Sequence, residues 1–407
     1  GHLHSMLLWG PPGTGKTTTA AAFLATRFAI DPSLLPSDVI LAAPTGKASR
    51  RLEQSIHKAA DEQSFMSQAG LPTEKLRALT AHTLHKTLGF TTKPPEQGGP
   101  FRHSASHPLP AKIVLVDEAS MVDLSLFLHL LKALPTTAQL IVLGDEDQLE
   151  SVEIGGTLTS LIQRYPQSVF RLRHCFRSES ADIIELAKAF KPGNTQRPTW
   201  SKLSQTLKLD RVEFQDIPST TVHLPSNVCD KLRQEWAPYR KVVQGLDPEI
   251  PDSVSASFDA LNQFQILCAQ REGTGGVNEI NRIAIGNTFG FPHGTPLLIT
   301  KNERLLDLTN GDIGIVYHPN SHSVPTVIFP HRAPLSLAQL PPHEPAWAFT
   351  IHKSQGSEFQ RCCIFLPPDT NSPLLTHNLL YTAITRAKRS VQIFGPISSI
   401  DKLLSSK

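Results

Sequence analysis

The sequence predicts an α/β fold built on parallel sheets, and three observations support this prediction. Short apolar runs that suit buried parallel strands recur in the first half of the chain, at 6–9, 39–44, 113–118 and 139–145. Helical patterns separate them, at 17–28 and 48–60. Strands that alternate with helices are typical of a parallel sheet. A second set of such runs predicts a second sheet, at 264–269, 348–352, 361–367 and 391–395.

Two further segments set the domain boundaries. Residues 191–262 are rich in proline, serine and threonine, and only 228–239 has a clear period, so we expect a boundary region with peripheral helices. Residues 293–343 contain short strand-like pieces bounded by Asn-Gly and proline turns, which predict a small β-barrel inserted in the second domain. We therefore expect a first domain over 1–190 and a second over 263–407.

Composition excludes several classes of protein. The 407 residues carry 39 basic and 36 acidic side chains, a net charge of 39 − 36 = +3, and 40% are hydrophobic, so a disordered or fibrous chain is excluded. This charge balance neither demands nor excludes nucleic acid. No stretch approaches the roughly 20 apolar residues of a membrane helix. Five scattered cysteines indicate reduced thiols and a cytoplasmic protein rather than a zinc site. Because position 1 is not methionine and the first loop opens at Gly10, we expect an upstream segment.

The strongest motif spans 10–17 and matches G-x-x-x-x-G-K-[ST] between a strand and a helix. Its glycines let successive backbone N–H groups surround an anion, and the helix adds its positive N-terminal end. Lys16 would reach the β- and γ-phosphates, and the Thr17 hydroxyl would bind Mg²⁺. The predicted nucleotide-binding residues are Gly10, Pro11, Pro12, Gly13, Thr14, Gly15, Lys16, Thr17 and Thr18.

Acidic and amide side chains follow two other predicted strands. Asp117 and Glu118 end the run 113–118, at the sheet edge where open α/β folds bind ligands. Asp117 would hold Mg²⁺, and Glu118 would polarise the attacking water. Gln148 lies just beyond the run 139–145, where an amide can sense the γ-phosphate, although an ordinary acidic turn is the alternative.

Motifs in a fixed order resemble those of superfamily 1 helicases, specifically the RecD family of bacterial exonuclease V. They are GPPGTGKTT (10–18), APTGKAS (43–49), TLH (83–85), VDEASMVD (116–123), LGDEDQL (143–149), CFRS (175–178), LCAQREG (267–273), NGDIG (310–314), TIHKSQGSEF (350–359) and LLYTAITRAK (379–388). The resemblance covers nearly all of the chain except about 191–262. It implies two RecA-like P-loop NTPase domains, and an SH3-like barrel for the insert at 293–343.

The resemblance also assigns roles to single residues. Gln148 corresponds to the family's γ-phosphate sensor, and Arg177 and Arg386 to two arginines that reach the γ-phosphate from the other side of a cleft. Gly356 and Glu358 match the nucleotide-contacting segment of the second domain. With Lys16 and Glu118, the sensor and the two arginines form the expected catalytic set. The implied cofactors are ATP and Mg²⁺.

Residues that grip a nucleic-acid strand are implied in both domains, as small hydroxyl and basic groups at strand ends. They are Pro44, Thr45, Gly46, Lys47, Thr83, His85, Thr350, His352, Lys353 and Ser354. Segment 89–110 occupies the place of a strand-separating pin, but it is short and rich in proline and glycine, so a long hairpin is not expected. Two family features are absent: the upstream glutamine motif that reads adenine, and the N-terminal domain.

The resemblance implies an ATP-dependent helicase moving 5′→3′ on single-stranded DNA, in double-strand break repair and recombination, with RecB and RecC as partners. Nuclease chemistry is not expected in this chain. Three alternatives stay open: a stand-alone RecD-like helicase acting without RecB and RecC, an RNA helicase, and a nucleotide-switched binding protein. Glu118 argues against the last, because a switch does not need a complete hydrolytic set.

Overall fold

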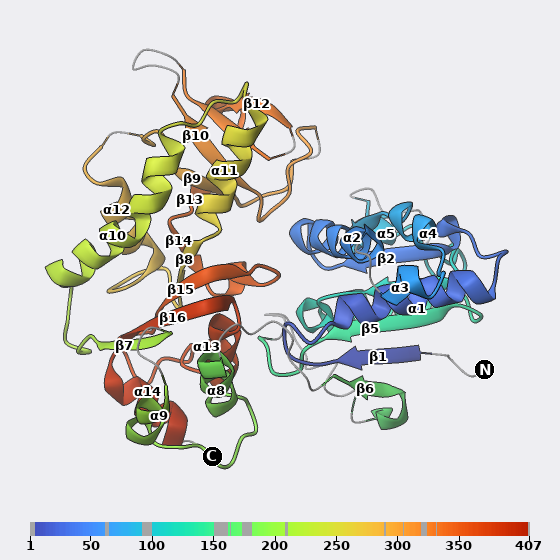
Figure 1. Cartoon of the computed structure of the whole chain (residues 1–407), viewed down its shortest axis with the longest axis horizontal. Coiled ribbons are helices and arrows are strands. Elements are labelled where there is room, and N and C mark those ends of the chain that lie inside the picture. Colours follow the sequence, from blue (N-terminus) through green and yellow to red (C-terminus); the bar gives the residue numbers. More distant parts are fainter. Residues whose placement is uncertain are drawn as a thin grey trace. The chain divides into compact units, whose positions relative to one another are not determined.

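The computed structural model describes residues 5–61, 65–91, 100–149, 162, 164–172, 181–207, 211–288, 290–303, 305–318, 324–330 and 332–405. The chain divides into two compact units, Gly1–Arg177 and Ser178–Lys407, which are described separately below (Figure 1). Within the described ranges, no helix is long and apolar enough to cross a bilayer.

The first unit contains a six-stranded sheet in the order β3-β2-β4-β5-β1-β6, and every neighbouring pair is parallel. Its strands are β1 (Ser5–Trp9), β2 (Val39–Ala43), β3 (Ala81–Thr83), β4 (Ile113–Val116), β5 (Gln139–Gly144) and β6 (Val169–Arg171). The prediction of a parallel α/β sheet is confirmed. The edge strands β3 and β6 were not predicted, because three residues are too few to form an apolar run.

Helices cover both faces of this sheet (Figure 1). They are α1 (Lys16–Ile30), α2 (Gly46–Asp61), α3 (Phe65–Gln68), α4 (Thr73–Arg77), α5 (Leu84–Thr87) and α6 (Leu124–Ala133), with 3-10 turns η1 (Pro36–Asp38), η2 (Ala119–Met121) and η3 (Pro166–Ser168). Side chains alternate across each strand. Leu115 of β4 therefore packs with α1 and α2, whereas Val114 and Val116 pack with α6. A hydrophobic core on each face holds the sheet in place, so the carboxyl ends of its parallel strands lie together along one edge.

The second unit contains a parallel sheet in the order β14-β8-β15-β16-β7. Its strands are β7 (Val212–Asp216), β8 (Phe264–Cys268), β14 (Ala348–Thr350), β15 (Phe359–Phe365) and β16 (Ala387–Gly395). Its helices are α8 (Ala181–Ala189), α9 (Trp200–Thr206), α10 (Ser226–Val243), α11 (Pro251–Leu261), α12 (Val277–Ile285), α13 (His377–Ile384) and α14 (Ile397–Ser405), with η4 (Leu337–Gln339) and η5 (His352–Ser354).

The boundary region differs from the prediction in two ways. Helix α8, expected in a first domain over 1–190, lies in the second unit. Strand β7, within the expected boundary region 191–262, pairs with β16 as an edge strand of the second sheet. Its residues V-E-F-Q-D alternate apolar and polar and are only partly buried, so no continuous apolar run marked the strand.

The predicted insert forms a five-stranded antiparallel sheet in the order β12-β11-β10-β9-β13. Its strands are β9 (Pro296–Ile299), β10 (Ile313–Tyr317), β11 (Thr326–Phe329), β12 (Arg332–Ser336) and β13 (His343–Pro345). One face has a core of its own around Leu297, Val316 and Val327, and the other adds Ile315 and Ile328 to the core of the second unit. Closure into an SH3-like barrel stays a prediction.

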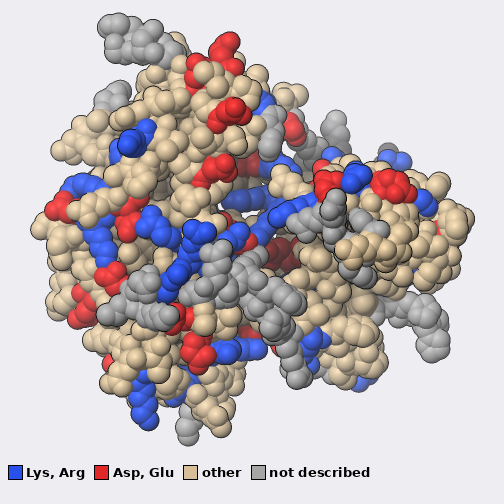
Figure 2. Space-filling view, viewed as in Figure 1, with Lys and Arg blue, Asp and Glu red and all other residues tan. Residues whose placement is uncertain are grey.

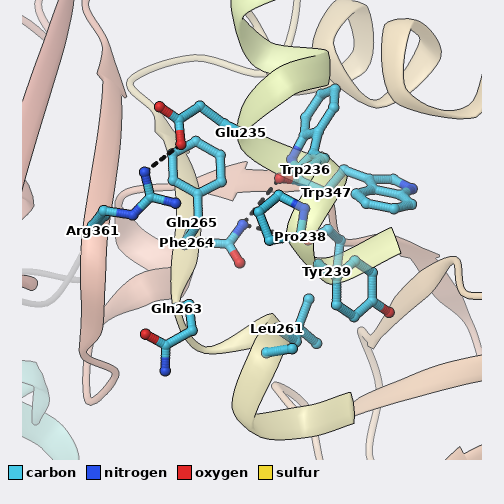
Figure 3. A pocket seen from close by; sticks show the side chains of 12 residues that line it. Glu235, Trp236, Pro238, Tyr239, Leu261, Gln263, Phe264, Gln265, Trp347 and Arg361 are labelled. Atoms are coloured by element: carbon cyan, nitrogen blue, oxygen red, sulfur yellow. Dashed lines mark hydrogen bonds and ion pairs between the residues drawn. The ribbon is translucent and has the colours of Figure 1, made fainter. Parts of the chain in front are cut away.

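A small pocket lies where α10 and α11 meet β8 (Figure 3). Trp236 and Tyr239 of α10 meet Trp347 edge-on, with ring centroids 5.4 and 5.5 Å apart. Gln265 of β8 donates to the carbonyl of Trp347 at 3.2 Å, and Arg361 pairs with Glu235. None of the predicted site residues lines this pocket, and its contacts attach α10 to the second sheet.

Candidate nucleotide site and strand-contact loops

The loop after β1 has the backbone geometry of an anion cradle. Gly13 and Gly15 have φ values of 77° and 81°, in the left-handed region that favours glycine. A Cβ on Gly10 would lie 2.5 Å from the carbonyl oxygen of Leu172, so a side chain does not fit there either. The Gly10 N–H donates to Gly144 at the end of β5, which ties the loop to the sheet edge. Helix α1 begins at Lys16, so its free N–H groups face the loop.

The Lys16 ammonium lies against this loop. Its Nζ donates to the carbonyl oxygens of Gly10 at 2.6 Å and Pro11 at 3.0 Å. Thr14 closes the turn by donating to Pro11 at 2.8 Å. Thr17, on the first turn of α1, is half-buried, whereas Thr18 is exposed. A phosphate bound in this loop would offer its oxygens to the Lys16 ammonium. Hydrogen bonds to these charged oxygens are stronger than the two bonds to backbone carbonyls.

Asp117 and Glu118 follow β4 at the same edge of the sheet. The Asp117 N–H donates to Ala42 of β2, and its carboxylate accepts the Glu118 N–H at 2.8 Å. Removal from water and the Glu118 charge raise the pKa of Asp117 to about 6, while Lys16 and Arg51 act in the opposite direction. Glu118 has φ 50° and ψ 41°, a left-handed conformation that is uncommon outside glycine.

This donor set fits Mg²⁺. A hydroxyl at Thr17 and a carboxylate at Asp117 are oxygen ligands of the kind that Mg²⁺ prefers, together with phosphates and water. Burial and the neighbouring Glu118 charge raise the pKa of Asp117 by more than Lys16 and Arg51 lower it. A bound cation would lower this pKa. Among the described residues, no group of three or more His, Cys, Asp or Glu side chains forms another candidate metal site.

Gln148 is buried and oriented by a neighbour that the sequence reasoning did not single out. Its amide nitrogen donates to Asp145 Oδ2 at 3.0 Å, and the other oxygen of Asp145 accepts the Asp147 N–H at 3.2 Å. Asp145 directly follows β5, so the side chain that sets the direction of the amide stands at the same sheet edge as the phosphate loop. Asp145 belongs to the same LGDEDQL motif, which could have revealed it.

The first predicted strand-contact loop adjoins the acidic pair, because Asp117 bonds to Ala42 and the loop begins two residues later at Pro44. Thr45 caps α2, accepting the Ala48 N–H at 3.2 Å. Lys47 stands on the first turn of α2. Removal from water and the positive charges of Arg51 and Arg50 lower the pKa of Lys47 to about 8. Arg51, not predicted from sequence, thus influences both the strand-contact loop and Asp117.

Thr83 and His85 lie at the start of α5. Thr83 caps this helix, accepting the Lys86 N–H at 3.2 Å. The exposed His85 ring packs edge-on against Phe90, with centroids 5.5 Å apart. The expected pin at 89–110 begins here: Thr91 donates to Pro100 and Arg102 donates to Gly89, which forms a short antiparallel stem. Residues 92–99 lie outside the described ranges.

In the second unit, Thr350, His352, Lys353 and Ser354 lie together where β14 ends. The Lys353 N–H donates to Thr350 Oγ1 at 3.4 Å, and its ammonium pairs with Glu344 at 2.6 Å. Removal from water lowers the pKa of His352. Ser354 is buried and donates to the Ile351 carbonyl at 2.6 Å, so its hydroxyl holds the turn. Exposed lysine and arginine side chains gather on the visible face of this unit (Figure 2).

The predicted nucleotide segment of the second unit is organised by Arg386, which is 2% exposed. Its Nε donates to the Thr382 carbonyl and its Nη1 to the Ser357 carbonyl, each at 3.2 Å. Gly356 has φ 70°, and Glu358 pairs with Lys388 at 3.5 Å. Arg386 therefore fixes the loop that carries Gly356 and Glu358, a structural function that the motif alone did not indicate. Arg177 lies outside the described residues.

We expect Arg386→Ala to destabilise the second unit, because it removes a buried guanidinium that donates to the Ser357 and Thr382 carbonyls. Each hydrogen bond to a charged group contributes about 1.5 kcal/mol or more, so the free energy of unfolding should fall by about 3 kcal/mol. Urea unfolding measures this loss. The control is Arg389→Ala, at an exposed position three residues away. Equal stability of the two variants would contradict the structural role.

Comparisons with known proteins identify the family of the chain. The family described as "AAA domain" matches residues 2–153, and "UvrD-like helicase C-terminal domain" matches residues 345–393. The RecBCD enzyme subunit RecD of Mycobacterium tuberculosis is 34% identical over 97% of this chain and 67% of its own length. The chain belongs to the RecD family of superfamily 1 helicases. The resemblance predicted from the ordered motifs is confirmed.

Other relatives and solved structures extend the comparison. RecD of Haemophilus influenzae is 31% identical over 96% of this chain and 66% of its own length. The ATP-dependent RecD2 DNA helicase of Deinococcus radiodurans is 31% identical over 94% of this chain and 46% of its own length. The Pif1 helicase of Candida albicans has a TM-score of 0.53 at 16% identity, covering 98% of this chain and 92% of that one. Bacteroides Pif1 bound to single-stranded DNA also gives 0.53 at 16% identity, covering 96% and 88%. These two likenesses concern the fold alone.

Proposed function

We propose that this chain is an ATP-dependent DNA helicase that moves along single-stranded DNA, as the motor of a RecD-type enzyme in double-strand break repair and recombination. One observation carries the proposal. The phosphate loop, the Asp117–Glu118 pair and Gln148 stand at one edge of the first sheet, and the strand-contact loop at 44–47 adjoins them. A nucleotide site and a strand site that share a sheet edge can influence each other directly. Membership of the RecD family supports the same conclusion.

The residues of the first unit have separate tasks in ATP hydrolysis. Lys16 and the loop N–H groups bind the β- and γ-phosphates, and Thr17 and Asp117 would hold Mg²⁺. When bound there, Mg²⁺ would neutralise charge on the phosphates. Glu118 accepts the proton of the attacking water, and Gln148, oriented by Asp145, hydrogen-bonds to the γ-phosphate or that water. For Arg177, and for Arg386 of the second unit, the resemblance implies stabilisation of charge on the transferred phosphoryl group. For Gly356 and Glu358 of the second unit it implies contact with nucleotide.

Movement follows from two sets of strand contacts. The residues of 44–47 with Thr83 and His85 grip the strand in the first unit, and Thr350 with 352–354 grip it in the second. Contacts to phosphate and sugar rather than to base edges allow any sequence to pass. The insert at 293–343 guides the strand, and the stem formed by 88–91 with 100–103 acts at the duplex junction. The resemblance to RecD favours 5′→3′ movement, partners of the RecB and RecC type, and a cytoplasmic location.

An unwinding assay tests this proposal. Duplexes with a 5′ or a 3′ single-stranded overhang are offered with ATP and Mg²⁺, with and without RecB- and RecC-type partners. We expect unwinding from the 5′ overhang and ATP hydrolysis that single-stranded DNA stimulates. Activity without partners would favour the stand-alone helicase. Preference for RNA in competition would favour an RNA helicase, and ATP hydrolysis that no strand stimulates would favour a nucleotide-switched binding protein.

Lys47 should make strand binding depend on pH. Its pKa of about 8 in the free protein means that the ammonium is present below pH 8 and lost as the pH rises above it. A hydrogen bond to a charged group contributes about 1.5 kcal/mol, so affinity for an oligo(dT) strand should fall about tenfold between pH 7 and pH 9.5. Fluorescence anisotropy measures the affinity. Lys47→Arg keeps its charge throughout and should flatten this profile; parallel profiles for the two proteins would contradict the assignment.

A further inference from the structure

Three charged side chains from separate segments of the second unit meet at one point. Glu344 of β13 pairs through Oε1 with Lys353 Nζ at 2.6 Å, and through Oε2 with Arg271 Nη2 at 2.8 Å. Each carboxylate oxygen thus holds one cation. Lys353 was predicted to contact a nucleic-acid strand, whereas neither Arg271 nor Glu344 was assigned a role from the sequence.

The backbone explains why these residues meet. Strands β8 and β14 are parallel neighbours with Cys268 opposite Thr350, so the segments that carry Arg271 and Lys353 leave the sheet at the same edge. Glu344 lies on β13 of the antiparallel sheet, opposite Leu298 of β9, and its carboxylate reaches both of these segments.

The carboxylate lies deeper than both cations. The side chain of Glu344 is 16% exposed, against 49% for Arg271 and 29% for Lys353. Removal from water alone would raise the pKa of Glu344, but hydrogen bonds from Arg271 and Lys353 outweigh it and lower the pKa. The same carboxylate raises the pKa of Arg271. Glu344 therefore stays ionised, and it holds both cationic groups from a more buried position.

The cations keep the capacity to bind a second anion. A guanidinium has five N–H donors and an ammonium three, while Glu344 accepts one hydrogen bond from each of these groups. The charges of Arg271, Lys353 and Glu344 sum to +1. The Glu272 charge also acts on Arg271, and the Glu272 carboxylate accepts a hydrogen bond from Asn278 of α12.

We propose that Arg271 and Lys353 form a two-cation subsite for one phosphodiester group of single-stranded DNA, with Glu344 as a positioning residue that holds both cations in place. The inference rests on the proposed function, because it takes its ligand from that function. It adds Arg271 to the strand contacts at 350–354. The planar guanidinium can donate to both non-bridging oxygens of the phosphodiester at once, and the ammonium can donate to one of the same two oxygens.

The salt dependence of binding tests the subsite. Affinity of the 407-residue chain for a fluorescent oligo(dT) strand is measured by anisotropy over a range of salt concentrations. Each phosphate contact with single-stranded DNA contributes about 0.7 to the slope of log K against log salt concentration. We expect Arg271→Gln to weaken binding several-fold and to reduce the slope by at most about 0.7, because Lys353 still contacts the same phosphate. Arg271→Lys should keep the slope, because its charge remains.

Matched variants separate the possible outcomes. Arg233→Gln on α10 removes an exposed arginine that also pairs with a carboxylate, Asp230 at 2.7 Å, and should bind as the wild type does. Glu344→Gln keeps both cations, so we expect the slope to stay and the affinity to fall several-fold. Arg271→Gln indistinguishable from Arg233→Gln would overturn the subsite, and Glu344→Gln with wild-type affinity would overturn the positioning role. Absence of salt-dependent binding by the wild type would overturn the proposed function and this inference together.

Discussion

Lys16→Gln is expected to abolish ATP hydrolysis and DNA unwinding while leaving the fold intact. The substitution removes the ammonium that donates into the phosphate loop, with Nζ 2.6 Å from the Gly10 carbonyl oxygen. Glutamine retains a hydrogen-bond donor but no positive charge, so it cannot offset the charge that develops on the phosphoryl oxygens. The loss of a single preorganised donor costs about 10²–10³ in turnover, and the loss of its charge should place this variant at the upper end or beyond.

Steady-state phosphate release, with and without single-stranded DNA, measures the effect. Lys132→Gln replaces an exposed lysine at the end of α6 and should hydrolyse ATP as the wild type does. Urea unfolding should show similar stability for both variants, since the Lys16 bonds to Gly10 and Pro11 join neighbouring parts of one loop. DNA-stimulated hydrolysis that survives in Lys16→Gln would refute the assignment of the phosphate site.

The core of each sheet could be predicted from sequence because buried parallel strands have continuous apolar runs. All four residues of β4 are buried, as the run 113–116 implies. The missed strands lie at sheet edges. Strand β7 has one fully buried residue and strand β6 none, so their sequences resemble those of loops. Edge strands depend on their neighbour for pairing, and that information lies far along the chain: Val212 pairs with Val391.

The candidate site shows the same division. Residues within a few positions of a strand end, such as Asp117 and Lys353, could be placed at a sheet edge because the strand and the residue are close in sequence. The side chains that orient them could not be predicted, because these partners lie far apart in sequence. Glu344 and Arg271 are 73 positions apart, and Arg386 and Ser357 are 29 positions apart. The motif assigned Arg386 to phosphate chemistry, and only the folded chain reveals that it also holds a loop. Tertiary contacts thus supply the orientation that motif spacing lacks.

Glu118→Gln is expected to separate nucleotide binding from hydrolysis. Glutamine has nearly the shape of glutamate, so the left-handed turn at φ 50° and the bond from its N–H to Asp117 can persist. The amide cannot accept a proton from the attacking water, and a positioned general base contributes about 10²–10⁴ in rate. Turnover should fall by about that factor, while affinity for ATP with Mg²⁺ is retained. Single-turnover hydrolysis and equilibrium binding of a fluorescent ATP analogue measure the two quantities separately, and Glu74→Gln on α4 is the exposed control.

Glu118→Gln should also change the pH dependence of nucleotide binding. The Glu118 charge helps raise the pKa of Asp117 to about 6, so its removal should lower that pKa. Asp117 then remains ionised at a lower pH, and Mg²⁺-dependent binding of the analogue should persist further below pH 6 in Glu118→Gln than in the wild type. A simple disruption of the turn would instead weaken binding at every pH. Turnover within a few-fold of the wild type would mean that another residue is the general base. Binding profiles that coincide over pH would mean that the Glu118 charge does not affect the pKa of Asp117, although the two residues are adjacent after β4.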